Sequence, residues 1–146
     1  MGRKMDKIQK LTINCIVLIS FSSATFTDEL KDIIDSKKSS FEEIALDIWN
    51  YAELGYLETK SSNLLASELE ENGFIIQKGV AGIPTSFIAE FNNGGPVIGI
   101  LGEFDALPGL AQTNSPFKEV ADNETGAGHA CGHHLFGAAS AWAAVA

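Results

Sequence analysis

The chain has 146 residues, a formal net charge of −9 and a sequence pI near 4.6, and 45% of its residues are hydrophobic. This composition is typical of a folded, water-soluble protein and excludes the collagenous, disordered and disulfide-rich classes. Ten lysines and arginines face 19 aspartates and glutamates, with no basic run that could neutralise a phosphate backbone. We therefore expect no nucleic-acid partner.

The first 24 residues have the three-part layout of a secretory signal. Four lysines and arginines lie within the first ten residues, a mostly apolar stretch follows over residues 11–21, and small residues occupy positions 22–24. The apolar stretch over residues 11–21 is well short of the roughly 20 residues that a membrane-crossing helix needs. We therefore expect no stable membrane anchor after processing. We predict a signal peptide over residues 1–24 and a periplasmic or extracellular protein. The alternative is a disordered or surface-lying amino terminus on a cytoplasmic protein.

Helical patterns follow this leader. Residues 25–40 are polar and are predicted to form a linker or a loose helix. Ser40 and Glu43 form a capping-box pattern, and the apolar positions after them repeat with a helical period as far as position 52. A second helix is predicted from Thr59 to the Asn-Gly pair at 72–73, where glycine suits a left-handed cap.

The pattern then changes to short β-type runs. Residues 74–80 and 86–91 are predicted strands, and the apolar run 96–101 suits a strand covered on both faces, as in an α/β layer. A small-residue helix is predicted over residues 133–146. These elements are fewer than a self-sufficient α/β sheet needs, so we expect residues 41–146 to be the front part of a longer α/β catalytic domain.

Metal-binding residue types cluster near the end of the chain. All three histidines (His129, His133 and His134) and Cys131 lie within the segment GHACGHH at 128–134. Imidazole and thiolate suit Zn²⁺ and related divalent ions, and a metal would account for a thiol that has no disulfide partner after processing. The alternative is a buried cysteine beside histidines that cap the final helix.

Two carboxylates provide further candidate ligands. Glu103 and Asp105 follow the apolar run 96–101, at the end of a predicted buried strand, where α/β proteins place their sites. Because they are two positions apart, they share a face in an extended segment. Alone, the string DALPG at 105–109 is usually just a turn; beside the histidine and cysteine cluster it favours a metal site.

Four ordered motifs carry a family resemblance: AELGYLE at 52–58, GVAGIPTSFIAEF at 79–91, GEFDALPGL at 102–110 and GHACGHHLFGAAS at 128–140. Together they resemble the amidohydrolase branch of the dinuclear metallopeptidases, relatives of aminoacylase and carboxypeptidase G, and within it the aminobenzoyl-glutamate hydrolase-like type. The resemblance implies part of a zinc-peptidase-like α/β/α catalytic domain. It also implies two divalent ions (zinc, manganese or cobalt), dimeric full-length proteins, and hydrolysis of an amide bond in a small N-acyl or aminoacyl amino-acid conjugate, of the aminobenzoyl-glutamate or dipeptide type.

The resemblance also assigns roles to residues. It implies that Cys131 and His133 are metal ligands and that Asp105 is a catalytic residue that orients a ligand or the attacking water. His129 and His134 are expected to be neighbours of the ligands. The chain ends before the family's general-base glutamate and its later ligands, so we expect an inactive fragment. A non-catalytic exported module that binds metal or a partner is the alternative.

Overall fold

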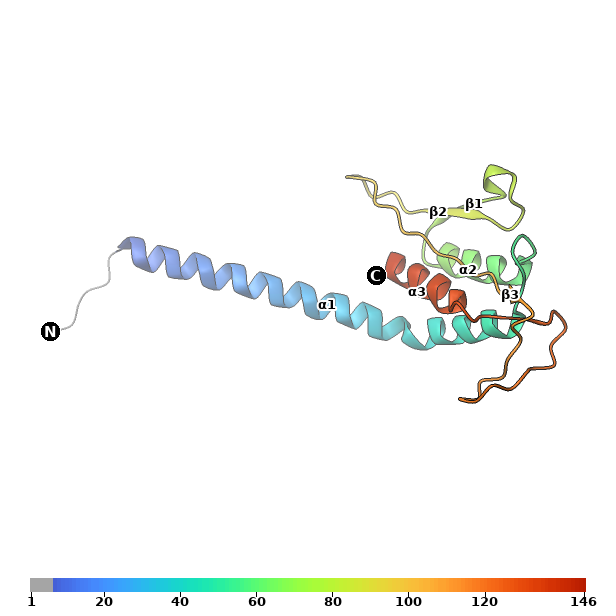
Figure 1. The fold of residues 1–146 in the computed structure, drawn as a ribbon. Helices are drawn as coiled ribbons and strands as arrows, with labels where there is room; N and C mark the ends of the chain where they lie inside the picture. The colour runs from blue at the N-terminus through green and yellow to red at the C-terminus, as the bar shows by residue number, and fades with distance from the viewer. Residues whose placement is uncertain (1–6) are drawn as a thin grey trace. The chain divides into compact units, whose positions relative to one another are not determined.

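The computed structural model describes the backbone of residues 7–146 and the side chains from residue 27 onward (Figure 1). The chain divides into two compact units, residues 1–36 and residues 37–146. The predicted signal peptide, residues 1–24, lies outside the residues whose side chains are described. Within the described part of the chain, no helix is both long enough and apolar enough to span a membrane.

Helix α1 runs from Lys7 to Tyr51, so residues 27–40 are helical. The helix start predicted at Ser40 is therefore wrong. Since the preceding residues are helical, their carbonyls accept the amide hydrogens that a cap would have served. The Ser40 hydroxyl instead donates to Glu68 Oε2 at 3.3 Å.

Three helical segments build the main core of the second unit. The end of α1 packs with α2, Thr59–Glu71, and with α3, His133–Val145, both close to their predicted bounds. The buried apolar positions of α1 keep the predicted helical spacing, and the Phe41 ring stacks on Trp142 at 5.9 Å. The core comprises Phe41, Ile44, Ala45, Ile48, Leu65, Leu69, Ala138 and Ala141.

The predicted glycine cap of α2 is confirmed. Gly73 has φ of +90°, its amide donates to the Glu70 carbonyl, and the Phe74 amide donates to the Leu69 carbonyl. This pair of hydrogen bonds is a Schellman motif, which satisfies two carbonyls of the last turn. It turns the chain sharply from α2 into the first strand.

The two predicted β-type runs form an antiparallel hairpin. Strand β1, Ile75–Lys78, pairs with β2, Phe87–Glu90, and Ile76 lies opposite Ala89. The short 3-10 helix η1, Val80–Gly82, lies in their connection. Alternate side chains of the hairpin, among them Ile76, Phe87 and Ala89, pack against the helical core.

The buried strand predicted over residues 96–101 is wrong. The segment forms no ladder with any described strand, and its apolar side chains are exposed, Val97 completely. Its Leu101 carbonyl accepts one hydrogen bond, from Ser140 Oγ at 2.7 Å. A continuous apolar run requires covering on both faces to be a buried strand, and the described residues provide neither a pairing strand nor a second layer.

A second small sheet lies beyond this segment. Strand β3, Leu107–Pro108, pairs antiparallel with β4, Ala127–Gly128. A Cβ on Gly128 would come within 2.1 Å of the Leu110 carbonyl oxygen, so only glycine fits there. The described chain is thus mixed α and β, three helices with two two-stranded sheets, consistent with part of a peptidase-like domain.

Candidate metal centre

The segment that carries Glu103 and Asp105 is fixed by the loop after α1. The Ala106 amide donates to the Glu53 carbonyl at 2.7 Å, and Leu54 and Ala106 form an isolated parallel bridge. Ala106 is buried in a small cluster with Ala52 and Ala127. Asp105 is therefore anchored by its neighbour in the chain and projects from a well-defined piece of backbone.

Helix α3 approaches this segment closely because Gly137 has no side chain. A Cβ on Gly137 would lie 2.8 Å from the Glu103 carbonyl oxygen and 3.1 Å from Phe104 Cβ. The small residues predicted for this helix thus allow it to pack closely against the segment 103–104. It brings His133, in the first turn of α3, to the side chains of Glu103 and Asp105.

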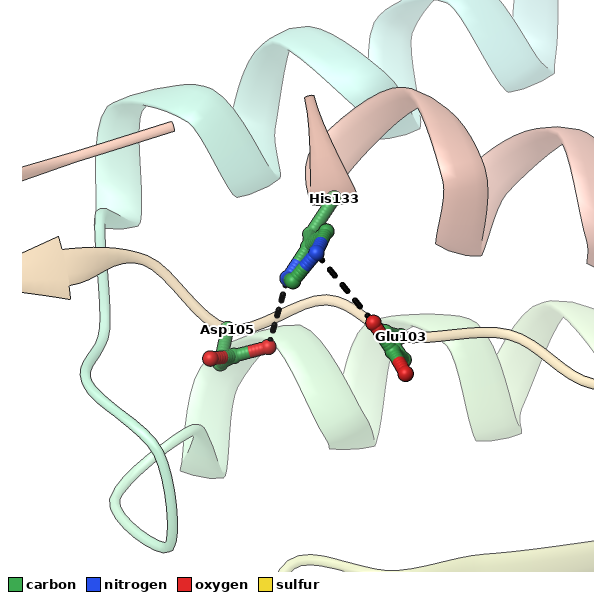
Figure 2. A group of neighbouring side chains, drawn as sticks. All are labelled: Glu103, Asp105 and His133. Carbon is green, nitrogen blue, oxygen red and sulfur yellow. Dashed lines mark hydrogen bonds and ion pairs between the residues drawn. The ribbon is translucent and has the colours of Figure 1, made fainter. Parts of the chain in front are cut away.

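Glu103, Asp105 and His133 converge on one point (Figure 2). His133 Nδ1 lies 2.7 Å from Asp105 Oδ1, and His133 Nε2 lies 3.2 Å from Glu103 Oε2. The three residues each offer a ligand atom, and these atoms lie within 4.8 Å of one another. The His133 side chain is 22% exposed and those of Asp105 and Glu103 are 32% and 51% exposed, so the group opens to solvent on the Glu103 side.

The donor set fits a divalent cation. Carboxylates only accept hydrogen bonds, so His133 can donate to both partners only when both of its nitrogens carry a proton; with one proton, it turns a lone pair toward one carboxylate. A cation between His133 Nε2 and Glu103 would replace that repulsion by coordination. Asp105 would then hold the Nδ1–H, the arrangement in which a carboxylate orients a metal-binding histidine. One nitrogen and carboxylate oxygens suit zinc, manganese or cobalt.

Of the residues predicted from sequence, the structure brings Asp105 and His133 together but not Cys131. Cys131 is an exposed free thiol on the turn before α3, and its sulfur is not among the converging ligand atoms. Glu103 is the third residue of the converging group. Its signal is present in the sequence, because a carboxylate two positions from Asp105 shares its face in an extended segment.

The other two histidines lie behind the group. Burial lowers the pKa of His134 to about 4, and burial lowers the pKa of His129 as well, with hydrogen bonding to the Ile48 main chain opposing it. Their rings are 5.0 Å apart, and both lie against Trp49. His129 is buried and His134 is partly buried, and the lowered pKa of each keeps its ring neutral at ordinary pH.

One further carboxylate near the group has no predicted role. Glu58 is buried and accepts a 2.6 Å hydrogen bond from Thr85 Oγ1. A Cβ on Gly55 would lie within 4 Å of both Glu58 Oε1 and Asp105 Oδ2. In the sequence, the feature that points to Glu58 is its place in the AELGYLE motif.

The structure combines a mixed α and β fold with the convergence of an imidazole and two carboxylates, and comparison with known proteins identifies the family. The chain belongs to the amidohydrolase/peptidase family. It is 40% identical over 117 residues to a subunit of the p-aminobenzoyl-glutamate hydrolase of Escherichia coli, a match that covers 80% of the chain and 24% of the relative. It is 31% identical over 104 residues to hippurate hydrolase of Campylobacter jejuni, covering 71% of the chain and 26% of the relative.

The name of a third relative indicates another acylated amino acid as its substrate. N-acetylcysteine deacetylase of Bacillus subtilis is 38% identical over 89 residues, covering 60% of the chain and 22% of that protein. No family model matches the chain. The chain spans about a quarter of the length of these relatives.

Proposed function

We propose that the protein serves metal-dependent hydrolysis of an amide bond in an N-acyl or aminoacyl amino-acid conjugate. The observation that carries this proposal is the position of His133 between Asp105 and Glu103, at 2.7 Å and 3.2 Å. The names of the relatives support the substrate class, since they include hydrolases of p-aminobenzoyl-glutamate and hippurate and a deacetylase of N-acetylcysteine.

Each residue of the group has a distinct part in this proposal. Asp105 accepts the Nδ1–H of His133 and so directs the Nε2 lone pair toward Glu103. His133 Nε2 and Glu103 would hold the ion, and Cys131 on the turn that precedes α3 remains a proposed additional ligand. When bound, a divalent ion supplies Lewis acidity to an amide carbonyl and to water.

The location of the group at the start of α3 stabilises its two carboxylates. Gly132, with φ of +76°, precedes the first turn of α3, whose free amide hydrogens give the helix start a partial positive charge. Glu103 and Asp105 lie next to this helix end through their contacts with His133. The two carboxylates are therefore held in place without an ion and need little rearrangement to accept one.

Cobalt titration of the purified chain tests the metal centre. We expect a Co²⁺ absorption band that saturates, and an affinity lowered on the order of 10–100-fold by Asp105→Asn, the loss usual for a group that orients a ligand. His133→Ala should lower the affinity further, because it removes a proposed ligand. Asp122→Asn is the matched control, because Asp122 is a carboxylate outside the group. Equal affinity in wild type and the three variants would contradict the proposal.

Hydrolysis is measured separately with p-aminobenzoyl-glutamate, hippurate and N-acetylcysteine in the presence of Mn²⁺, Zn²⁺ or Co²⁺. Turnover that is lost in His133→Ala supports the full proposal. Saturable Co²⁺ binding without turnover would favour the alternative, a non-catalytic metal-binding module, over hydrolysis by this chain.

A further inference from the structure

His129 is almost completely buried, with 4% of its surface exposed, and joins two distant parts of the chain. Its Nε2 lies 3.0 Å from the carbonyl oxygen of Ile48, near the end of α1 and 81 positions away in sequence. A carbonyl oxygen only accepts, so the proton of the imidazole is on Nε2 and the ring donates. The side chain therefore ties the segment after β4 to the last turns of α1.

The same residue organises the turn that leads into α3. The His129 carbonyl accepts the Gly132 amide at 3.0 Å, and the Gly132 carbonyl accepts the amides of Leu135 and Phe136. This turn carries Cys131 and delivers His133 to the first turn of α3. The orientation of His133 thus depends on a turn whose first residue is anchored by the His129 ring.

The ring lies outside the group of converging ligand atoms. Its Nε2 is used by Ile48, and its Nδ1 is buried without a hydrogen-bond partner and is not among the converging ligand atoms. The ring is enclosed by Trp49 and His134, which leaves it little freedom to rotate.

We infer that His129 is a positioning residue: its Nε2–H···O bond to Ile48 fixes the turn 129–132 on α1 and so holds His133 at the distance from Asp105 and Glu103 that the candidate metal centre requires. This inference rests on the proposed function only in taking the centre to be a metal site. The hydrogen bond itself is a property of the metal-free chain and can be tested without metal.

Two substitutions separate the hydrogen bond from packing. His129→Gln keeps a donor at about the position of Nε2 and loses the ring, whereas His129→Phe keeps a ring and loses the donor. We expect Co²⁺ affinity on the order of tenfold weaker for His129→Phe than for wild type, and close to wild type for His129→Gln. The reverse order would show that the ring only fills space, and equal affinities would also overturn the inference.

A metal-free measurement makes the inference independent of the proposed function. In ¹H–¹⁵N spectra of the chain without metal, His129→Phe should shift the amide signals of residues 103–106 and 131–135, while those of β1 and β2 stay in place. His129→Gln should leave both sets near their wild-type positions. If wild type fails to bind Co²⁺ but the spectra behave in this way, the proposed function fails and the positioning role stands. Unchanged spectra in His129→Phe overturn the role whatever the metal result.

Discussion

At the scale of single residues, the candidate centre depends on how each imidazole is surrounded. His133 lies between two carboxylates at the solvent-accessible edge of the second unit. His129 and His134 lie behind it among apolar groups, and burial lowers the pKa of each. Three histidines within six positions of sequence thus have two different chemical environments.

These environments predict a stability that falls in acid. Burial lowers the pKa of His134 from 6.5 to about 4 in the folded chain. Between these two values the unfolded chain binds more protons, so the free energy of unfolding decreases as the pH falls from about 6.5 toward 4. The effect is absent above pH 6.5, where the group is neutral in both states.

Thermal unfolding from pH 4.5 to 7.5 measures this dependence. We expect His134→Gln to show a shallower fall of Tm with acid than wild type, because one of the buried titrating groups is gone. The carboxylates titrate in both proteins and cancel in the difference. Parallel Tm curves would contradict burial of a neutral His134.

At the scale of elements, the approach of α3 to the segment 103–105 is set by Gly137. Alanine normally stabilises an exposed helix position by about 1 kcal/mol relative to glycine. At Gly137 the added Cβ would meet the Glu103 carbonyl oxygen at 2.8 Å, so we expect Gly137→Ala to lower stability by about 1–3 kcal/mol through overpacking. Co²⁺ affinity should fall with it, because α3 carries His133.

Denaturant unfolding and Co²⁺ titration of Gly137→Ala check this expectation. Gly99→Ala is the matched control, since a Cβ there has no atom within 4 Å and its φ lies outside the left-handed region. A stabilised Gly137→Ala with wild-type affinity would mean that α3 and the segment 103–105 are farther apart than the structure has them.

Helix α2 offers a second element-scale prediction. Its first turn has no local side-chain cap; Glu53 supplies one from the preceding loop, accepting the Lys60 amide at 2.9 Å and the Ser61 amide and hydroxyl at 2.8 Å. We expect Glu53→Ala to lower the free energy of unfolding by about 2 kcal/mol, measured by denaturant titration, because it leaves buried Ser61 donors unpaired. Glu71→Ala, at the exposed other end of α2, should change it by less than about 0.5 kcal/mol.

The sequence predicts these elements unevenly, for physical reasons. The stripe of apolar residues in α1 and α2, the glycine cap at Gly73 and the hairpin strands depend on local spacing, and each is confirmed. The Ser40 cap is wrong because the capping-box pattern does not report whether helix precedes it. The Glu53 cap and the approach of His133 to Asp105 join residues 8 and 28 positions apart, for which no local pattern exists.

At the scale of the whole molecule, the most important wrong prediction is the buried strand over residues 96–101. The composition of this run predicts a buried strand, and in the described chain its apolar side chains are exposed, with Ile98 at 82%. Burial of such a run depends on covering layers, which local sequence cannot reveal. The family supplies the context: the chain spans about a quarter of the length of its relatives.

This exposed run predicts self-association. Contiguous exposed apolar surface favours burial between molecules, while a net charge of −9 opposes it by repulsion that salt screens. We expect the purified chain to associate more at high ionic strength, and Ile98→Glu to reduce association. Asn92→Glu is the control, since it adds the same charge at an exposed polar position. Sedimentation that is equal in the three proteins would contradict the role of the run.

The crowding at Gly128 has a consequence for the genetic robustness of this protein. Because a Cβ there would lie 2.1 Å from the Leu110 carbonyl oxygen, every missense codon at this position meets a backbone atom that cannot rotate away. Tolerance to random mutation at this position, next to the histidine and cysteine segment, is thereby limited by backbone geometry. This glycine is therefore needed to keep β3 and β4 paired, whatever the chain binds.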